Sequence, residues 1–226
     1  MPLPSTPHAV IFDMDGLLLD TEALYRTAIM GACDELGFAM DDALHLSLVG
    51  CPLDANRIRL EAAFGPAFPF DTYVTTYRAR FAVLAQHGIP VRPGAPELLT
   101  YLRETGLPAA VATSTGRPAA LKHLQQAGFL DSFRAVVARD DVSRGKPDPE
   151  VFLTAAQRLG VEPHLCLALE DSHNGVRAAA AAGMMTVMAP DLLGPTPEME
   201  RLCVHIVSDL HQVRMMLEER RTAAFA

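Results

Sequence analysis

The sequence predicts an α/β protein, in which a helical cap domain is inserted into a doubly wound, Rossmann-like parallel sheet core. Short apolar runs rich in Val, Ile and Ala alternate with helix-like segments, which is typical of a parallel sheet covered on both faces. The alternation is interrupted once, directly after the first apolar run, where residues 17–89 contain no comparable run. A sheet with one helical insertion accounts for both observations.

Six runs are predicted to form buried strands because they lack the polar alternation of a half-exposed strand. In chain order they are residues 8–13, 109–113, 135–138, 166–170, 186–189 and 204–208. Helical segments lie between and after them, several ending at a glycine, at 97–104, 118–127, 150–159, 174–182 and 209–220.

The insertion shows helical spacing of apolar residues over 23–36, 54–64 and 71–85, and its exit, 88–96, is dense in Gly and Pro. We therefore expect residues 1–16 and 90–226 to form a catalytic core and residues 17–89 a cap. The insertion begins just after the first strand, where open α/β sheets bind ligands, so we interpret the cap as a lid that selects substrate.

Composition excludes several classes of function. The chain has 19 Lys and Arg against 27 Asp and Glu, a net charge of −8, and its basic residues are scattered, which argues against nucleic acid or an anionic membrane as partner. It has no signal-peptide pattern and no apolar run of membrane-spanning length, so we expect a cytoplasmic protein. Only two residues are lysines, Lys122 and Lys146.

Polar groups follow the predicted strands at the edge where parallel strands end. Any one of them could simply cap the next helix, as Asp, Ser and Thr commonly do. Together, oxygen ligands and one of two lysines at several strand ends favour a divalent cation paired with a phosphate. The groups are Asp13 and Asp15 after the first strand, Thr113 and Ser114 after the second, Glu170 and Asp171 after the fourth, and Lys146 in the loop before it.

The string FDMDGLLLDTE at 12–22, followed in order by these motifs, resembles the haloacid dehalogenase superfamily. The similar sub-group carries a small helical cap after the first motif and includes beta-phosphoglucomutase and sugar-phosphate phosphatases. The resemblance implies an Mg²⁺-dependent phosphatase that acts on a small, sugar-like phosphate monoester through an aspartyl-phosphate. It implies a small-molecule partner, and we expect a monomer, with a dimer as the open alternative.

Residue roles follow from the same resemblance. Asp13 is the implied nucleophile and Asp15 the general acid and base. Mg²⁺ is held by Asp13, the main-chain carbonyl of Asp15 and Asp171, with Glu170 as an outer partner. The Thr113 hydroxyl, the Ser114 amide and Lys146 are the implied donors to the phosphoryl oxygens, with the Thr115 amide as a further candidate. Lys146 is also expected to pair with a carboxylate.

The residues at single positions favour or exclude other activities of the superfamily. Asp15 argues against a dehalogenase, and the absence of lysine from residues 17–89 excludes a cap Schiff base. Tyr25 stands where beta-phosphoglucomutase has His, which favours hydrolysis. A phosphomutase, a phosphoglycolate phosphatase and a non-catalytic protein of the same fold remain as alternatives. In the cap, Asn56 and Arg57 are the predicted contacts to the leaving group, with Arg78 and Arg80 as alternatives.

Overall fold

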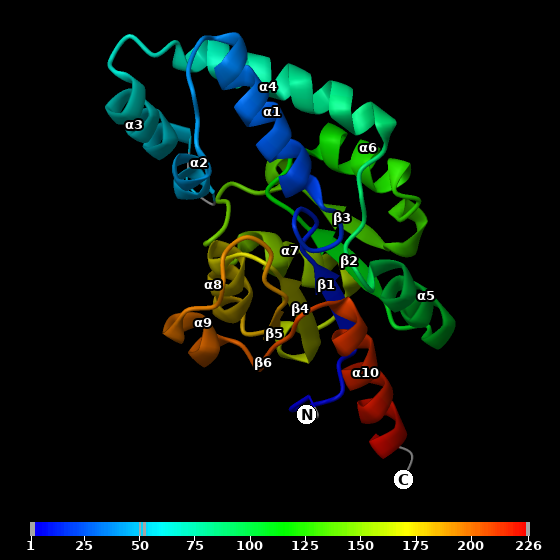
Figure 1. The fold of residues 1–226 in the computed structure, drawn as a ribbon. Coiled ribbons are helices and arrows are strands. Elements are labelled where there is room, and N and C mark those ends of the chain that lie inside the picture. The colour runs from blue at the N-terminus through cyan, green and yellow to red at the C-terminus, as the bar shows by residue number, and fades with distance from the viewer. Residues whose placement is uncertain (1–2, 50, 52, 225–226) are drawn as a thin grey trace. The chain divides into compact units, whose positions relative to one another are not determined.

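The computed structural model describes residues 3–49, 51 and 53–224, and it confirms the predicted fold class. Within these residues, six parallel strands form one sheet in the order β3-β2-β1-β4-β5-β6, flanked by helices (Figure 1). The strands are β1 (Ala9–Phe12), β2 (Ala109–Ala112), β3 (Ala135–Val137), β4 (Cys166–Glu170), β5 (Met185–Met188) and β6 (His205–Ile206). All six predicted strands are present. β1, β2 and β3 are shorter than predicted by one or two residues, β6 is shorter by three, and β5 begins and ends one residue earlier.

The strand order reverses its direction at β1. The chain runs from β1 outward through β2 to β3 and then returns to the other side of β1 for β4. Phe12 is in register with Val111 on one side and with Leu169 on the other, so Asp13 and Glu170 are the next residues of neighbouring strands. A ligand crevice is expected at such a switch point, beyond the carboxyl ends of the strands.

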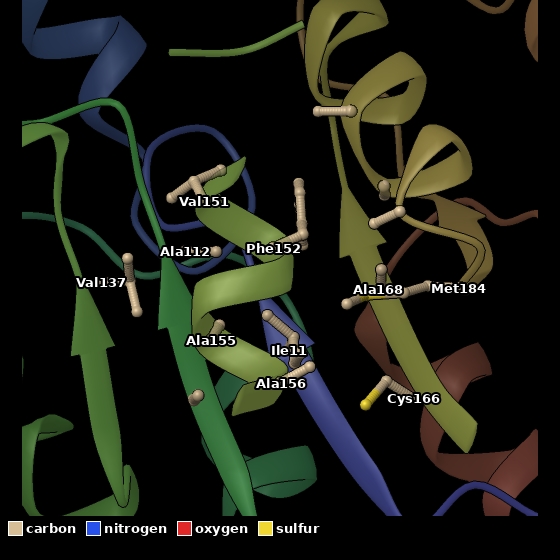
Figure 2. Close-up of a cluster of buried hydrophobic side chains, with 14 of the residues drawn as sticks. Ile11, Ala112, Val137, Val151, Phe152, Ala155, Ala156, Cys166, Ala168 and Met184 are labelled. Atoms are coloured by element: carbon tan, nitrogen blue, oxygen red, sulfur yellow. The ribbon is translucent and has the colours of Figure 1, made fainter. Parts of the chain in front are cut away.

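One face of the sheet is covered by α7 (Glu150–Leu159) and α8 (His173–Ala181). Figure 2 shows Phe152 and Ala155 of α7 packed among Ile11 and Ala112 of the strands. The small side chains let the helix approach the sheet closely, and Phe152 fills the remaining space. This packing fixes the strand ends on which the polar side chains stand.

Further helices complete the core unit, and α5 and α10 contact each other. α9 was not expected from the sequence, because its six residues are too few for a periodic pattern, although Thr196 caps it and Pro197 opens it. None of the helices in the described ranges is long and apolar enough to cross a lipid bilayer. These further elements are α5 (Ala95–Thr105), α6 (Arg117–Gln126), α9 (Pro197–Leu202), α10 (Leu210–Ala224), and the short 3-10 helices η2 (Leu130–Ser132), η3 (Arg139–Asp141) and η4 (Pro163–Leu165).

The inserted segment, Thr21–Ile89, is a compact unit of its own, and the core unit runs up to Asp20 and resumes at Pro90. The insertion thus begins four residues later than the boundary drawn from the sequence, because residues 17–20 turn back onto the core through a hydrogen bond from the Leu18 amide to the Met14 carbonyl. We refer to Thr21–Ile89 as the cap unit.

The cap unit is helical, and its core is aromatic. The rings of Phe38, Phe64 and Phe68 pack against one another, and Tyr25 stacks on Phe81 at 4.0 Å between centroids. One short helix, α2, was not expected, although Asp41 caps it by accepting from the Leu44 amide at 2.7 Å. The helices are α1 (Thr21–Glu35), α2 (Asp42–Leu48), α3 (Leu53–Phe64), α4 (Phe70–Leu84) and the 3-10 turn η1 (Ala85–His87).

Candidate active site

The polar groups predicted at the strand ends lie on the core unit at the β1/β4 switch point. Asp13 and Asp15 follow β1, Thr113 follows β2, and Glu170 and Asp171 lie at the end of β4. Lys146, in the loop before α7, is hydrogen-bonded to two of them, Asp13 and Glu170.

Lys146 joins two carboxylates from neighbouring strands. Its ammonium donates to Oδ1 of Asp13 and, at 2.6 Å, to Oε1 of Glu170. The three side chains are 6%, 9% and 0% exposed, so the charges interact with little screening by water. The ammonium also lies 5.0 Å from the ring centroid of Phe152, the large side chain of the core described above.

Glu170 is held on both of its oxygens. Its Oε2 accepts from the amides of Asp171 and Ser172 and from the Ser172 hydroxyl, at 3.0–3.2 Å. Gly175 makes room for the carboxylate, because a Cβ at that position would lie 1.8 Å from Oε1. Both oxygens of Glu170 therefore have donors, and the carboxylate is held in one orientation.

The carboxyl groups of Asp13, Glu170 and Asp171 together carry more negative charge than the single ammonium of Lys146 can neutralise. Burial raises the pKa of Asp13 to about 8, because lost hydration outweighs the attraction of Lys146. Burial also raises the pKa of Asp171, and the charges of Glu170 and Asp13 add to it. Burial alone would lower the pKa of Lys146, but its two carboxylate partners outweigh this and raise it. Lys146 therefore stays an ammonium ion.

The same carboxylates fit a divalent cation. One ligand oxygen from each of Asp13, Glu170 and Asp171 lies within 4.8 Å of the other two. An all-oxygen donor set with excess negative charge suits a hard cation and would be relieved by it. Gly16 leaves the space open: its φ is 82°, and a Cβ there would lie 2.4 Å from Oδ2 of Asp171.

Asp15 is held by the residues after β2. Its Oδ2 accepts from the Thr115 hydroxyl at 2.6 Å and from the Thr113 hydroxyl at 3.4 Å. The Thr115 amide donates to the Thr113 hydroxyl at 3.0 Å, which ties the two threonines together. Ser114, between them, is exposed.

The Thr115 side chain was not among the predicted site residues. Its signal in the sequence is weak: it follows Thr113 by two residues, as Asp15 follows Asp13. Residues two apart in extended chain point to the same side, so the spacing could have suggested it.

The cap unit contains a pocket of about 170 Å³. Asn56 lines this pocket, and its Oδ1 is buried and accepts no hydrogen bond from the described residues, while its amide nitrogen donates to the Leu48 carbonyl at 3.2 Å. Tyr25, singled out from the sequence, also lines it, as does Glu22. The remaining lining residues are Ile29, His45, Leu48, Val49, Leu53, Phe70, Tyr73 and Tyr77.

Arg57 is engaged elsewhere in the cap unit. Its guanidinium pairs with Asp71 at 2.6 Å and lies 4.3 Å from the ring centroid of Phe70. Arg80, one of the alternatives, pairs with Glu35 at 3.0 Å, and Arg78 is exposed. Of the predicted cap residues, Asn56 is the one that lines the pocket.

The chain is similar to known proteins along most of its length. A family model of haloacid dehalogenase-like hydrolases matches residues 7–183. The phosphorylated carbohydrates phosphatase of Thermotoga maritima is 33% identical over 177 residues, covering 78% of this chain and 82% of that protein. Hexitol phosphatase B of Escherichia coli K12 is 32% identical over 199 residues, covering 82% of this chain and 86% of that protein.

A solved structure agrees with these sequence matches. The HAD family hydrolase of Deinococcus radiodurans, with bound phosphate and sodium, superposes with a TM-score of 0.81 at 27% identity, covering 96% of this chain and 97% of that one. The resemblance inferred from the motifs is confirmed by the family match, the phosphatase relatives and the shared fold. The chain belongs to the haloacid dehalogenase-like hydrolase family.

Proposed function

We propose that this phosphoric monoester hydrolase transfers the phosphoryl group of a small sugar phosphate first to Asp13 and then to water. The observation that carries the proposal is the buried contact of Asp13 with Lys146, beside Asp15, at the switch point of the sheet. A carboxylate fixed by a cation is an oriented nucleophile, and the same cation can bind the incoming phosphate.

In the first step an oxygen of Asp13 attacks phosphorus, and the bond from phosphorus to the leaving oxygen breaks. Asp15 gives its proton to that oxygen, so the product leaves as a neutral alcohol. In the second step Asp15 takes a proton from water as the water oxygen attacks phosphorus. The phosphoryl bond to Asp13 breaks, and inorganic phosphate and the free carboxylate result.

The phosphoryl oxygens need donors that stay in place. Lys146 is held by two carboxylates, and the Thr113 hydroxyl and the Ser114 amide follow the adjacent strand. Donors fixed before substrate arrives stabilise the charge on the equatorial oxygens without reorganising.

The metal ligands we propose are Asp13, the main-chain carbonyl of Asp15 and Asp171. Glu170 is the outer partner, because Lys146 and three further donors already occupy its oxygens. Mg²⁺ suits oxygen ligands of this kind, and when bound it offsets the repulsion between the phosphate and the attacking carboxylate.

The substrate class is supported by the relatives and by the cap pocket. Two of the relatives are named for phosphorylated carbohydrates and hexitols. The pocket combines tyrosine rings with the Glu22 carboxylate and the free carbonyl oxygen of Asn56. Apolar rings beside acceptors suit a polyhydroxylated leaving group, whose C–H faces pack and whose hydroxyls donate.

The test is phosphate release from a panel of pentose, hexose and hexitol phosphates, phosphoglycolate and β-glucose 1-phosphate, with Mg²⁺ or with EDTA. Wild type should release phosphate only with Mg²⁺. If the phosphoryl group of the substrate carries a radioactive label, quenching the reaction with acid should leave labelled phosphate bound to the protein. Asp13→Asn should lose both signals, and Asp131→Asn, at an exposed carboxylate, should keep them.

Phosphate release that persists in EDTA and in Asp13→Asn would contradict the proposal. Isomerisation of β-glucose 1-phosphate in the presence of a bisphosphate, without stoichiometric phosphate, would identify the phosphomutase instead.

A further inference from the structure

A fourth carboxylate, Asp191, lies beside the three that fit a cation. It follows β5, and Arg92 pairs with it, Nη1 donating to Oδ1 at 2.7 Å. The Asp191 side chain is 9% exposed. Arg92 is itself fixed, because its amide donates to the Leu18 carbonyl at 3.0 Å. One oxygen of Asp191 is therefore clamped in place.

The other oxygen of Asp191 has no donor. Its Oδ2 is buried and accepts no hydrogen bond from any described residue. Asp171 and Asp191 lie on the same side of Gly16. A Cβ atom placed on Gly16 would lie 2.4 Å from Oδ2 of Asp171 and 3.4 Å from Oδ2 of Asp191. The orphaned oxygen thus lies close to a proposed metal ligand, and both are acceptors.

We propose that Asp191 is a positioning residue of the metal site, which accepts a hydrogen bond from a water bound to the cation, while Arg92 fixes its orientation. The inference rests on the proposed function, because it takes Asp13 and Asp171 as ligands of Mg²⁺. Nothing in the sequence motifs or the family match assigns Asp191 or Arg92 a role.

The physical reason is the free-energy cost of leaving Oδ2 of Asp191 buried without a hydrogen-bond donor. A buried carboxylate oxygen without a donor loses its hydration and is repelled by the neighbouring Asp171. Mg²⁺ keeps several of its waters when it binds protein, and those waters are strong donors. A water held between the cation and Oδ2 of Asp191 would satisfy the oxygen and orient the coordination sphere, as outer partners of metal ligands do.

The experiment measures Mg²⁺ binding by isothermal titration calorimetry on the full chain, without substrate. Asp191→Asn should raise the Kd for Mg²⁺ about tenfold, which is typical when an outer partner of a metal ligand is lost. The rise in unfolding temperature on adding Mg²⁺ should shrink in parallel, because that rise reports the binding free energy. Glu198→Gln is the matched control: it breaks the Arg177–Glu198 pair, 2.6 Å long, elsewhere on the core unit, and should leave Kd unchanged.

An unchanged Kd in Asp191→Asn would overturn the inference and make the Arg92 pair a purely structural contact. If Asp191→Asn does not fold, Arg92→Gln decides in its place: a raised Kd supports the inference, and a wild-type Kd overturns it. If wild type itself binds no Mg²⁺, the proposed metal site fails, and this inference fails with it. That result differs from wild-type binding with no effect of the variants, which leaves the proposed function intact.

Discussion

The hydroxyl of Thr115 lies 2.6 Å from Oδ2 of Asp15, and it donates a hydrogen bond across 100 residues of sequence. Asp15 is the proposed acid, so Thr115 orients the group that protonates the leaving oxygen. In Thr115→Val, kcat/KM for an alkyl phosphate should fall about tenfold, the value of one hydrogen bond to a charged group. With p-nitrophenyl phosphate, whose leaving group departs without a proton, kcat/KM should stay near wild type.

Thr115→Ser keeps the hydroxyl and is the matched control, so it should behave as wild type with both esters. An equal loss of kcat/KM for both esters in Thr115→Val would mean that Thr115 serves binding or folding rather than proton transfer.

Lys146→Met should destabilise the protein. It leaves the fully buried Glu170 carboxylate without its ammonium partner, and removing one partner of a buried ion pair costs about 3 kcal/mol or more. Urea unfolding in EDTA measures the change. Lys122→Met replaces the other lysine, which is exposed, and should leave the free energy of unfolding unchanged. Similar values for the two variants would show that the charges at Asp13 and Glu170 do not depend on Lys146.

Mg²⁺ binding should strengthen as the pH rises from 6 to 8. The metal-free protein keeps protons on its carboxylates in this range, because burial raises the pKa of Asp13 to about 8 and raises that of Asp171 as well. The cation binds the ionised forms, so each displaced proton changes the affinity by up to about tenfold per pH unit. Calorimetry in buffers of different ionisation enthalpy should detect proton release, and an affinity independent of pH would contradict these raised pKa values.

Asp141 should stabilise the fold at neutral pH and lose that effect in acid. Burial alone would raise its pKa, but hydrogen bonds from the Ala138 amide, Arg117 and Arg158 outweigh it and lower the pKa to about 2. The folded pKa is below the unfolded one, so the contribution is complete above about pH 4 and is lost as the pH falls towards 2. Asp141→Asn should therefore cost about 2 kcal/mol at pH 7 and progressively less below pH 4.

Chemical unfolding across this pH range measures the Asp141 effect, with exposed Asp131→Asn as the control. A penalty for Asp141→Asn that stays constant down to pH 3 would assign it to lost packing rather than to charge.

Asn56→Ala should change which substrates are preferred. It removes the free acceptor of the cap pocket, so KM should rise about tenfold for hexitol and hexose phosphates and stay unchanged for phenyl phosphate, which has no leaving-group hydroxyls to donate. Arg57→Ala removes a side chain already paired with Asp71 and should lower stability while keeping the rank order of substrates. An unchanged rank order in Asn56→Ala would remove the cap pocket from the proposal.

The sheet could be predicted because buried parallel strands are continuous apolar runs, as in Val10–Ile11 and Leu167–Ala168, and these stand out from amphipathic helices. The helices α2 and α9 could not, because seven and six residues give too few turns for a periodic signal. Their caps, Asp41 and Thr196, were visible, but such residues also begin ordinary turns.

The residues of the site also fall into those that could be predicted from the sequence and those that could not. Asp13, Asp15 and Lys146 stand in motifs whose order along the chain is distinctive. The contact of Thr115 with Asp15 joins residues 100 positions apart, and that of Arg92 with Asp191 joins residues 99 positions apart. Arg92 and Asp191 belong to none of the motifs. Only the folded chain brings such partners together, and a single sequence contains no record of the pairing.

The two lysines give the protein a simple amine chemistry. Lys122 is exposed on α6, whereas the Lys146 amine is enclosed by two carboxylates and stays protonated. An acylating reagent needs an accessible, neutral amine, so the native fold should present one reactive lysine, and the second should react only when the structure around Asp13 and Glu170 opens. Of the two lysines, Lys122 is therefore the one to which an acylating dye or tether should attach in the native protein, and the rate at which Lys146 is acylated should report local unfolding at the site.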